Sequence, residues 1–309
     1  MATTDAHLAA AVLDGLVAAG VEFAILHNEE KIAGGDVGSD LDVVVAARPH
    51  TVIRQVRPVL ERAGLRPIMV WDYDVGHTLT VFLATPNASG GVQLDLMCDP
   101  TGRGKYGAKT ESMLESRVAG ARWPTVGPLH RLTYLIRKRH VKQDDDRLTT
   151  LVVEARSFPA EDLAAVIQET FTPRVAESLS RVVFGGDTRE APPYPRGYHP
   201  RNVARWLGRL RKPAGFWVEI TGDPPPELLN EVADRFGRIL PVVGAGVRPG
   251  RLSQIGWLRA AVAPIRWRAG LYVSGGIGWP AGDLRIAPSE DLDSLCFDIV
   301  GAMTQRLAG

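Results

Sequence analysis

The chain has 309 residues, of which 45% are hydrophobic and 23% charged, and its formal net charge is +1. These values are those of an ordinary soluble globular protein, and the length suits about two domains. A charge so close to zero provides no general attraction to nucleic acid or membrane, so any such partner would need a local feature. The two cysteines, Cys98 and Cys296, form no disulfide or metal-binding spacing, which is typical of a reducing compartment.

The N-terminal segment predicts an amphipathic helix. It contains Asp5 and Asp14 and has no basic stretch before its apolar residues, so it does not resemble a signal peptide. Thr3 or Thr4 would cap this helix, which should end at Gly20. No apolar run is long enough to span a membrane. We therefore expect a cytoplasmic protein with no membrane partner.

The next part of the chain predicts alternating strands and helices. Residues 49–65 begin with a proline, carry apolar residues at helical spacing and have a glycine near the end, so they predict a helix. Residues 29–39 are expected to form a glycine-rich loop. Apolar runs between turn residues predict the strands. These are residues 21–28, a strand beginning at Asp40, and residues 66–73, 77–84 and 92–99.

The second half of the chain is expected to be helical first and α/β afterwards. Residues 129–143 and 160–171 have apolar residues at spacings of three and four, which predicts helices. After a proline-rich boundary and a basic helix, we expect a strand, a helix, a second strand and a closing helix capped by Ser289. The predicted parts are an α+β domain over 1–128, a helical segment over 129–190, a linker with the basic helix over 191–210, and a small α/β domain over 211–309.

Three acids stand among strand-forming apolar residues. Asp40 and Asp42 flank Leu41, and because side chains at i and i+2 of a strand share a face, the two carboxylates should project together. Two such charges repel, so we expect a cation between them. Asp95 lies in the apolar run "VQLDLM", where an unpaired buried carboxylate is costly. The three acids could share one or two divalent cations; the alternative is solvated acids at strand ends.

The segment "GSDLDVVV" (residues 38–45), followed later by "LDL" (residues 94–96), resembles the nucleotidyltransferase superfamily, as in polymerase-beta-like and aminoglycoside nucleotidyltransferase folds. The resemblance covers roughly residues 5–185. "LHNEEKIAGGDVGSDLDVVV" is similar to bacterial proteins in which such a domain is fused to a thymidylate-kinase-like domain. Their first strand ends in an "L-R-N" element, and His27 stands in for its basic residue. The Gly-Ser turn that usually follows the first strand is replaced here by "LHNEE" (residues 26–30).

The resemblance implies an Mg²⁺-dependent (or Mn²⁺-dependent) enzyme that transfers a nucleoside monophosphate from an NTP such as ATP to an acceptor hydroxyl. Asp40 and Asp42 would hold the metal against the triphosphate, and Asp95 would share the second ion and help to deprotonate the acceptor. A small-molecule acceptor is favoured over RNA, and an oligomer is left open. The residues expected to contact the nucleotide are Gly38, Ser39, His27, Asn28, Lys105, Arg137 and Lys142, with Lys138 as a further candidate.

Two other functions stay open: a non-catalytic nucleotide-binding or scaffold protein, and a phosphotransferase acting through the C-terminal unit. The strand–turn–helix layout around "GDPPPE" (residues 222–227) resembles the start of a P-loop kinase domain of the thymidylate kinase type. However, this turn has no lysine, serine or threonine, and its prolines remove backbone donors, which predicts a degenerate kinase-like domain. An unrelated α/β domain is the alternative. Arg201, Arg205, Arg209 and Lys212 would line one helix face, either solvated or contacting RNA.

Overall fold

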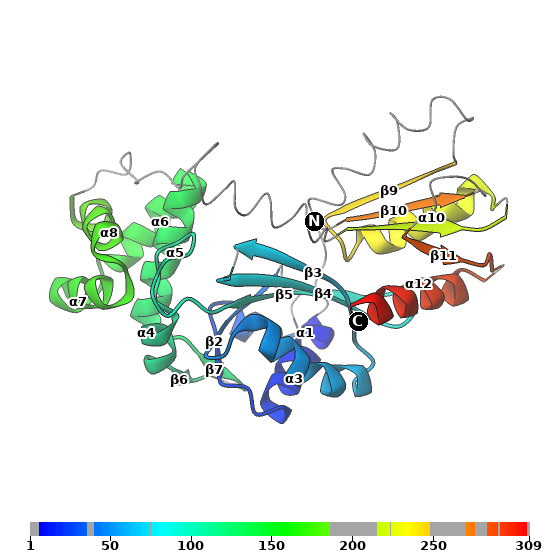
Figure 1. Cartoon of the computed structure of the whole chain (residues 1–309). Helices are drawn as coiled ribbons and strands as arrows, with labels where there is room; N and C mark the ends of the chain where they lie inside the picture. The colour runs from blue at the N-terminus through cyan, green and yellow to red at the C-terminus, as the bar shows by residue number, and fades with distance from the viewer. Residues whose placement is uncertain are drawn as a thin grey trace.

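The computed structural model of the protein describes residues 6–35, 40–74, 76–120, 122–185, 215–222, 224–247, 270–275, 283–289 and 291–307. These residues form a mixed seven-stranded sheet with helices on both faces and a second, four-stranded parallel sheet with its own helices (Figure 1). The architecture is therefore α+β in general terms, as the sequence predicts. Several expected features lie outside the described residues: Thr3, Thr4, Gly38, Ser39, the linker over 191–210, and the basic row Arg201, Arg205, Arg209 and Lys212.

The seven-stranded sheet contains the five strands expected from the sequence and two further short ones. Its order is β3-β4-β5-β2-β1-β7-β6, with β2 parallel to β5 and β1 parallel to β7. The unpredicted β6 and β7 have two residues each, too few to show a period. The strands are β1 (Phe23–Ile25), β2 (Leu41–Val45), β3 (Arg66–Asp74), β4 (Thr78–Ala84), β5 (Gly91–Met97), β6 (Val118–Ala119) and β7 (Pro124–Thr125).

The two faces of this sheet bury different residues of β2. Leu41 and Val43 belong to the core beneath helices α1 (Ala6–Ala18) and α3 (Pro49–Arg62). Val44 belongs to a separate core with the helical segment, so Asp42, two residues before it, shares that face. The expected alternation along β2 is confirmed, although β2 begins at Leu41 and Asp40 directly precedes it. The helical segment comprises α4 (Thr110–Glu115), α5 (Pro128–Lys142), α6 (Asp145–Ala155), α7 (Ala160–Thr170) and α8 (Pro173–Gly185).

The segment expected as a glycine-rich loop contains a short helix, α2 (Glu29–Ala33). The prediction of a continuous loop is wrong because a tertiary contact stabilises the first turn of this helix. Glu29 is buried, and its carboxylate accepts a hydrogen bond from the backbone N–H of Arg122 at 3.0 Å. Gly34 follows the last helical residue and marks the end of α2.

The described residues of the second unit form a parallel sheet of order β11-β8-β10-β9 and two helices. Its elements are β8 (Phe216–Ile220), α10 (Pro226–Gly237), β9 (Val242–Val247), β10 (Gly270–Gly275), β11 (Leu284–Ile286) and α12 (Leu292–Arg306). Asp291, and not Ser289, caps α12: its carboxylate accepts the N–H groups of Asp293 and Ser294 at 3.3 and 3.0 Å. The prediction of Ser289 is wrong because Asp291 is the residue that immediately precedes the helix.

The second unit shares a hydrophobic core with the first sheet. Met69 of β3 and Phe82 of β4 pack in one cluster with Phe236 and Ile239 of the second unit and with buried residues of α12. Phe82 is two residues from Thr80, so this contact uses the sheet face that also carries Asp42 and Asp95. In Figure 1 the middle strands of the sheet lie between the helical segment on one side and the second unit on the other.

Gly91, at the start of β5, is required for this close contact. A Cβ atom there would lie 2.6 Å from Cγ2 of Ile239 and 2.8 Å from the backbone oxygen of Leu83. Gly91→Ala is therefore expected to lower the free energy of unfolding by about 1–3 kcal/mol in urea unfolding experiments, as overpacked cores do. Gly237→Ala is the matched control, because nothing lies within 4 Å of a Cβ atom at that helical glycine. Equal losses of stability in Gly91→Ala and Gly237→Ala would contradict the requirement for glycine at position 91.

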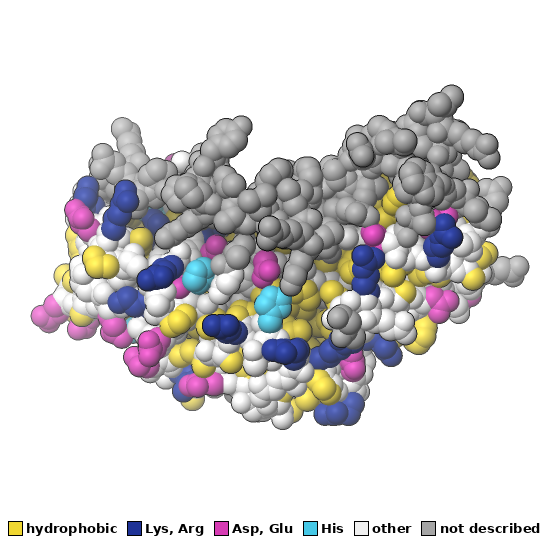
Figure 2. All heavy atoms as spheres, viewed as in Figure 1, with side chains coloured by type: hydrophobic (Ala, Val, Ile, Leu, Met, Phe, Trp, Pro, Cys, Tyr) yellow, Lys and Arg dark blue, Asp and Glu magenta, His cyan; other side chains and the backbone are white. Residues whose placement is uncertain are grey.

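None of the described helices combines the length and apolar character that a membrane crossing requires. Figure 2 shows basic and acidic side chains interspersed over the described part of one face. The functional evidence therefore has to come from local groups of side chains.

Candidate metal centre

Three carboxylates meet on one face of the first sheet. Asp42 of β2 lies directly opposite Asp95 of the parallel neighbour β5, and Asp40 precedes β2 on the same side. One ligand oxygen from each of the three acids lies within 4.8 Å of the others. Asp42 is buried, whereas Asp40 and Asp95 are half-buried. The structure therefore brings together the three acids that the sequence predicts as a metal site.

The Asp42 carboxylate is held by two side chains from other elements. Nζ of Lys138, in α5, lies 2.5 Å from Oδ2 of Asp42, and Nε2 of His27, just after β1, donates to the same oxygen at 2.6 Å. Lys138 is itself buried, so this is an interior ion pair. Oδ1 of Asp42 accepts no hydrogen bond from another described residue. Both side-chain donors therefore hold Asp42 through the same oxygen, Oδ2.

The Asp95 carboxylate is also held through one oxygen, in this case by neutral hydrogen-bond donors. Thr80, directly opposite it on β4, donates to its Oδ1 at 2.6 Å, and Nε2 of Gln93 donates to the same atom at 3.4 Å. Its Oδ2 receives no hydrogen bond from the described part of the chain. The Asp42 and Asp95 carboxylates are therefore each oriented through one oxygen, which leaves the second oxygen of each for a shared cation.

The two facing acids have opposite pKa shifts. Burial alone would raise the pKa of Asp42, but Lys138 and His27 hold it well below its usual range. Burial and the negative charges of Asp42 and Asp40 raise the pKa of Asp95 to about 7. Among the described residues, Asp95 has no cationic partner of its own within hydrogen-bonding distance. Oxygen ligands and unbalanced negative charge are what Mg²⁺ and Mn²⁺ require, so these residues fit a hard divalent ion.

The other predicted nucleotide contacts have partners or positions of their own. Nζ of Lys105 donates to the Tyr73 hydroxyl at 2.6 Å and lies over the Tyr73 and Tyr106 rings. Arg137 is buried and donates through Nε to the backbone oxygen of Tyr106 at 3.2 Å, and burial lowers its pKa to about 10. Lys142 is exposed one turn after Lys138.

Asn28 has a left-handed backbone (φ 68°) at the start of α2, and its side chain makes no capping hydrogen bond. The structure therefore places His27 and Lys138 against the acids, whereas Arg137 supports the loop after β5. The role of Thr80 was missed; its signal is a polar side chain inside the apolar run of β4.

Comparison with known proteins adds no assignment. A scan against protein-family models finds no match for this chain, and a search of curated proteins finds no significant match either. The function is therefore inferred from the arrangement of the side chains and from the sequence resemblance of residues 38–45.

Asp99 shapes the loop that carries Lys105 and Tyr106. Its buried carboxylate accepts the backbone N–H groups of Arg103 and Gly104 at 3.0 and 2.6 Å, and Nδ1 of His77 lies 3.2 Å away. Burial opposes its ionisation, but His77 and the two N–H groups lower its pKa overall. The ionised form of Asp99 therefore stabilises the folded loop.

Asp99→Asn is expected to lower the free energy of unfolding at pH 7 by about 1.5–3 kcal/mol, the usual value of hydrogen bonds to a charged group. Since the pKa of Asp99 is lower in the folded protein, its contribution exists above its pKa in the unfolded chain and disappears as the pH falls through its folded value. The difference in the free energy of unfolding between Asp99→Asn and the wild type, measured with urea, should therefore become smaller below about pH 4. The control is Asp234→Asn, an exposed acid of α10. If Asp99→Asn loses the same stability at every pH, the charge of Asp99 does not stabilise the loop.

Proposed function

We propose that this chain is a metal-dependent nucleotidyltransferase that moves a nucleoside monophosphate from an NTP to an acceptor hydroxyl. The observation that carries the proposal is the convergence of Asp40, Asp42 and Asp95 from two adjacent parallel strands, with ligand oxygens within 4.8 Å. The resemblance of residues 38–45 and 94–96 to the nucleotidyltransferase superfamily supports the same reaction. The mixed sheet with a helical segment beside it is compatible with such a domain.

Asp40, Asp42 and Asp95 would hold Mg²⁺ or Mn²⁺. When bound, such an ion neutralises charge on the phosphate oxygens and on the leaving pyrophosphate. His27 and Lys138 would orient Asp42 through Oδ2, so that Oδ1 faces the ligand. The acceptor oxygen forms a bond to the α-phosphorus, the bond to the bridging oxygen breaks, pyrophosphate leaves, and the hydroxyl proton passes to Asp95.

A specific observation favours the non-catalytic alternative. Lys138 already supplies a cation to Asp42 at 2.5 Å, so a protein that needs no metal could keep the same acids as a structural ion pair. The phosphotransferase alternative has less support, because the turn between β8 and α10 has no lysine, and its hydroxyl group, that of Thr221, donates to the backbone oxygen of Ile286 at 3.2 Å. A degenerate kinase-like unit retained for structure agrees with the core that it shares with β3 and β4.

The direct test supplies the full chain with each NTP, Mg²⁺ or Mn²⁺, and a cell extract, followed by mass spectrometry and a pyrophosphate assay. The proposal expects one class of acceptor to gain the mass of a nucleoside monophosphate, with pyrophosphate released. The same reaction with Asp95→Asn is the control for contaminating enzymes. Metal binding without any transfer by the wild type would favour the scaffold alternative.

A further inference from the structure

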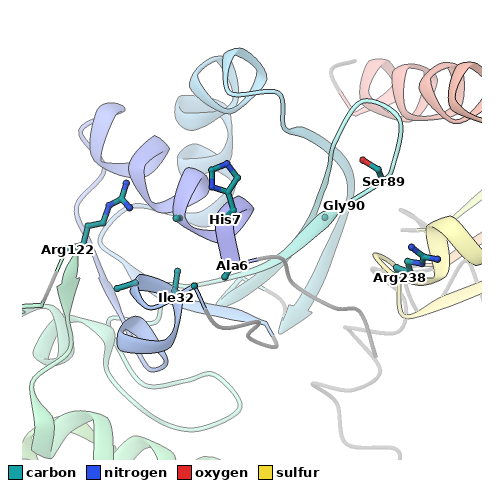
Figure 3. Close-up of a pocket in the computed structure, with 11 residues that line it drawn as sticks. Ala6, His7, Ile32, Ser89, Gly90, Arg122 and Arg238 are labelled. Atoms are coloured by element: carbon teal, nitrogen blue, oxygen red, sulfur yellow. The ribbon is translucent and has the colours of Figure 1, made fainter.

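A cavity of about 630 Å³ lies beside the N-terminal end of α1, and its described lining contains none of Asp40, Asp42 and Asp95. α1 covers the sheet face opposite to Asp42, whereas the unit that carries Arg238 packs on the face of Asp42, so the cavity lies at the edge of the sheet where β5 begins. The wall of the cavity comes from α1, α2, the turn between β4 and β5, and single residues before β7 and after α10 (Figure 3). This size is typical of sites for small molecules.

Close packing of the second unit forms one side of this cavity. The guanidinium of Arg235 donates to the backbone oxygen of Asn87 at 3.3 Å, and Ile239 packs against Gly91. These two contacts flank Arg238 in sequence and fix it at the edge of the cavity. On the other side, a Cβ atom at Gly90 would lie 3.0 Å from Leu8, so α1 also approaches the turn closely. The cavity is therefore a fixed feature of the packed units.

The described lining has an arginine at two of its edges and small residues and Ile32 between them. It contains Arg122, Arg238 and His7, and no acidic side chain. Arg122 shares its charge with Asp14, whose carboxylate lies 2.5 Å away. Arg238 makes no hydrogen bond or ion pair through its side chain with any described residue. The small and apolar part of the lining consists of Ala6, Ala10, Ile32, Ala33, Gly35, Gly90 and Gly91.

We propose that this cavity binds a small organic anion, with a phosphate or carboxylate group at Arg238 and an uncharged body against the alanines and Ile32. An oxyanion would supply the acceptors that the Arg238 guanidinium lacks among the described residues, and guanidinium groups match phosphate and carboxylate geometry. The apolar lining excludes a second charge from the body of the ligand. This site does not depend on the proposed transferase reaction.

The test uses fluorine NMR titration of the full chain with para-fluorophenyl phosphate, para-fluorobenzoate and neutral para-fluorophenol. We expect the two anions to bind and the phenol not to bind, and the tighter anion identifies the oxyanion that the site prefers. Arg238→Gln should weaken anion binding about tenfold, as expected for the loss of a charge-assisted hydrogen bond. Ala10→Leu should also weaken binding, because it fills the cavity.

Two variants make the test specific to this cavity. Arg156→Gln is the matched control, because Arg156 is likewise an exposed arginine directly after a helix, and it should leave binding unchanged. Asp14→Asn should tighten binding about threefold, since it frees the charge of Arg122 while an amide oxygen can still accept from the Trp123 indole. Equal affinity in wild type and Arg238→Gln, or no anion binding by the wild type, would overturn the proposal, whatever the outcome for the transferase reaction.

Discussion

Lys138→Met is expected to lower the free energy of unfolding by about 3–5 kcal/mol in metal-free buffer, because it removes the lysine that neutralises the buried Asp42 carboxylate and leaves only His27 beside it. Nζ of Lys138 lies 2.5 Å from Oδ2 of Asp42, and both side chains are less than 10% exposed. Urea unfolding in the presence of EDTA measures this loss. If the acids form a metal centre, added Mn²⁺ should stabilise the variant more than the wild type, since the ion replaces the missing positive charge.

Lys142→Met is the matched control for this experiment. Lys142 lies one turn further along α5 and is exposed, so its replacement should change stability by less than about 1 kcal/mol. The Mn²⁺ response separates the two functional alternatives. A destabilised Lys138→Met variant that Mn²⁺ does not rescue would mean that the lysine is the permanent partner of Asp42, as the scaffold alternative requires.

The local geometry of the acids could be predicted from the sequence because it depends on a strand period of two. Leu41 and Val43 enter one core while Asp42 and Val44 share the other face, as the alternation indicates. The third acid was identified because Asp95 stands in an apolar strand. Its register opposite Asp42 could not be read from the chain, since β2 and β5 are separated by two other strands and pair in parallel.

The partners of the acids were harder to predict because they come from distant segments. Lys138 lies 96 residues after Asp42, and its contact depends on how α5 rotates against the sheet. The sequence placed Arg137, Lys138 and Lys142 together as candidates for triphosphate, but only packing decides which of them turns toward Asp42. In the second unit, β11 has three residues, and no pattern of that length distinguishes a strand from a loop.

Asp95→Asn is expected to stabilise the metal-free protein and to abolish its response to metal. Burial and the neighbouring acids raise the pKa of Asp95 to about 7, so the folded protein binds this proton more tightly than the unfolded chain does. The free energy of unfolding of the wild type should therefore fall as the pH rises from about 4 to 7, and asparagine removes this loss. At pH 8 the variant should be more stable than the wild type by about 2–3 kcal/mol.

The same substitution should act in the opposite direction once a divalent ion is present. Asparagine retains an oxygen that can accept from Thr80, but the site loses one of its three carboxylates, so Mn²⁺ should stabilise the wild type and not the variant. Thermal unfolding at pH 8 with EDTA and with Mn²⁺ measures both effects in one series, with Asp234→Asn as the exposed acidic control. The order of the two unfolding temperatures should depend on the metal. In EDTA the variant should unfold at the higher temperature, and Mn²⁺ should raise the unfolding temperature of the wild type only. An Asp95→Asn protein that is less stable than wild type in EDTA, or that keeps the full metal shift, would remove Asp95 from the metal centre and with it the proposed proton acceptor.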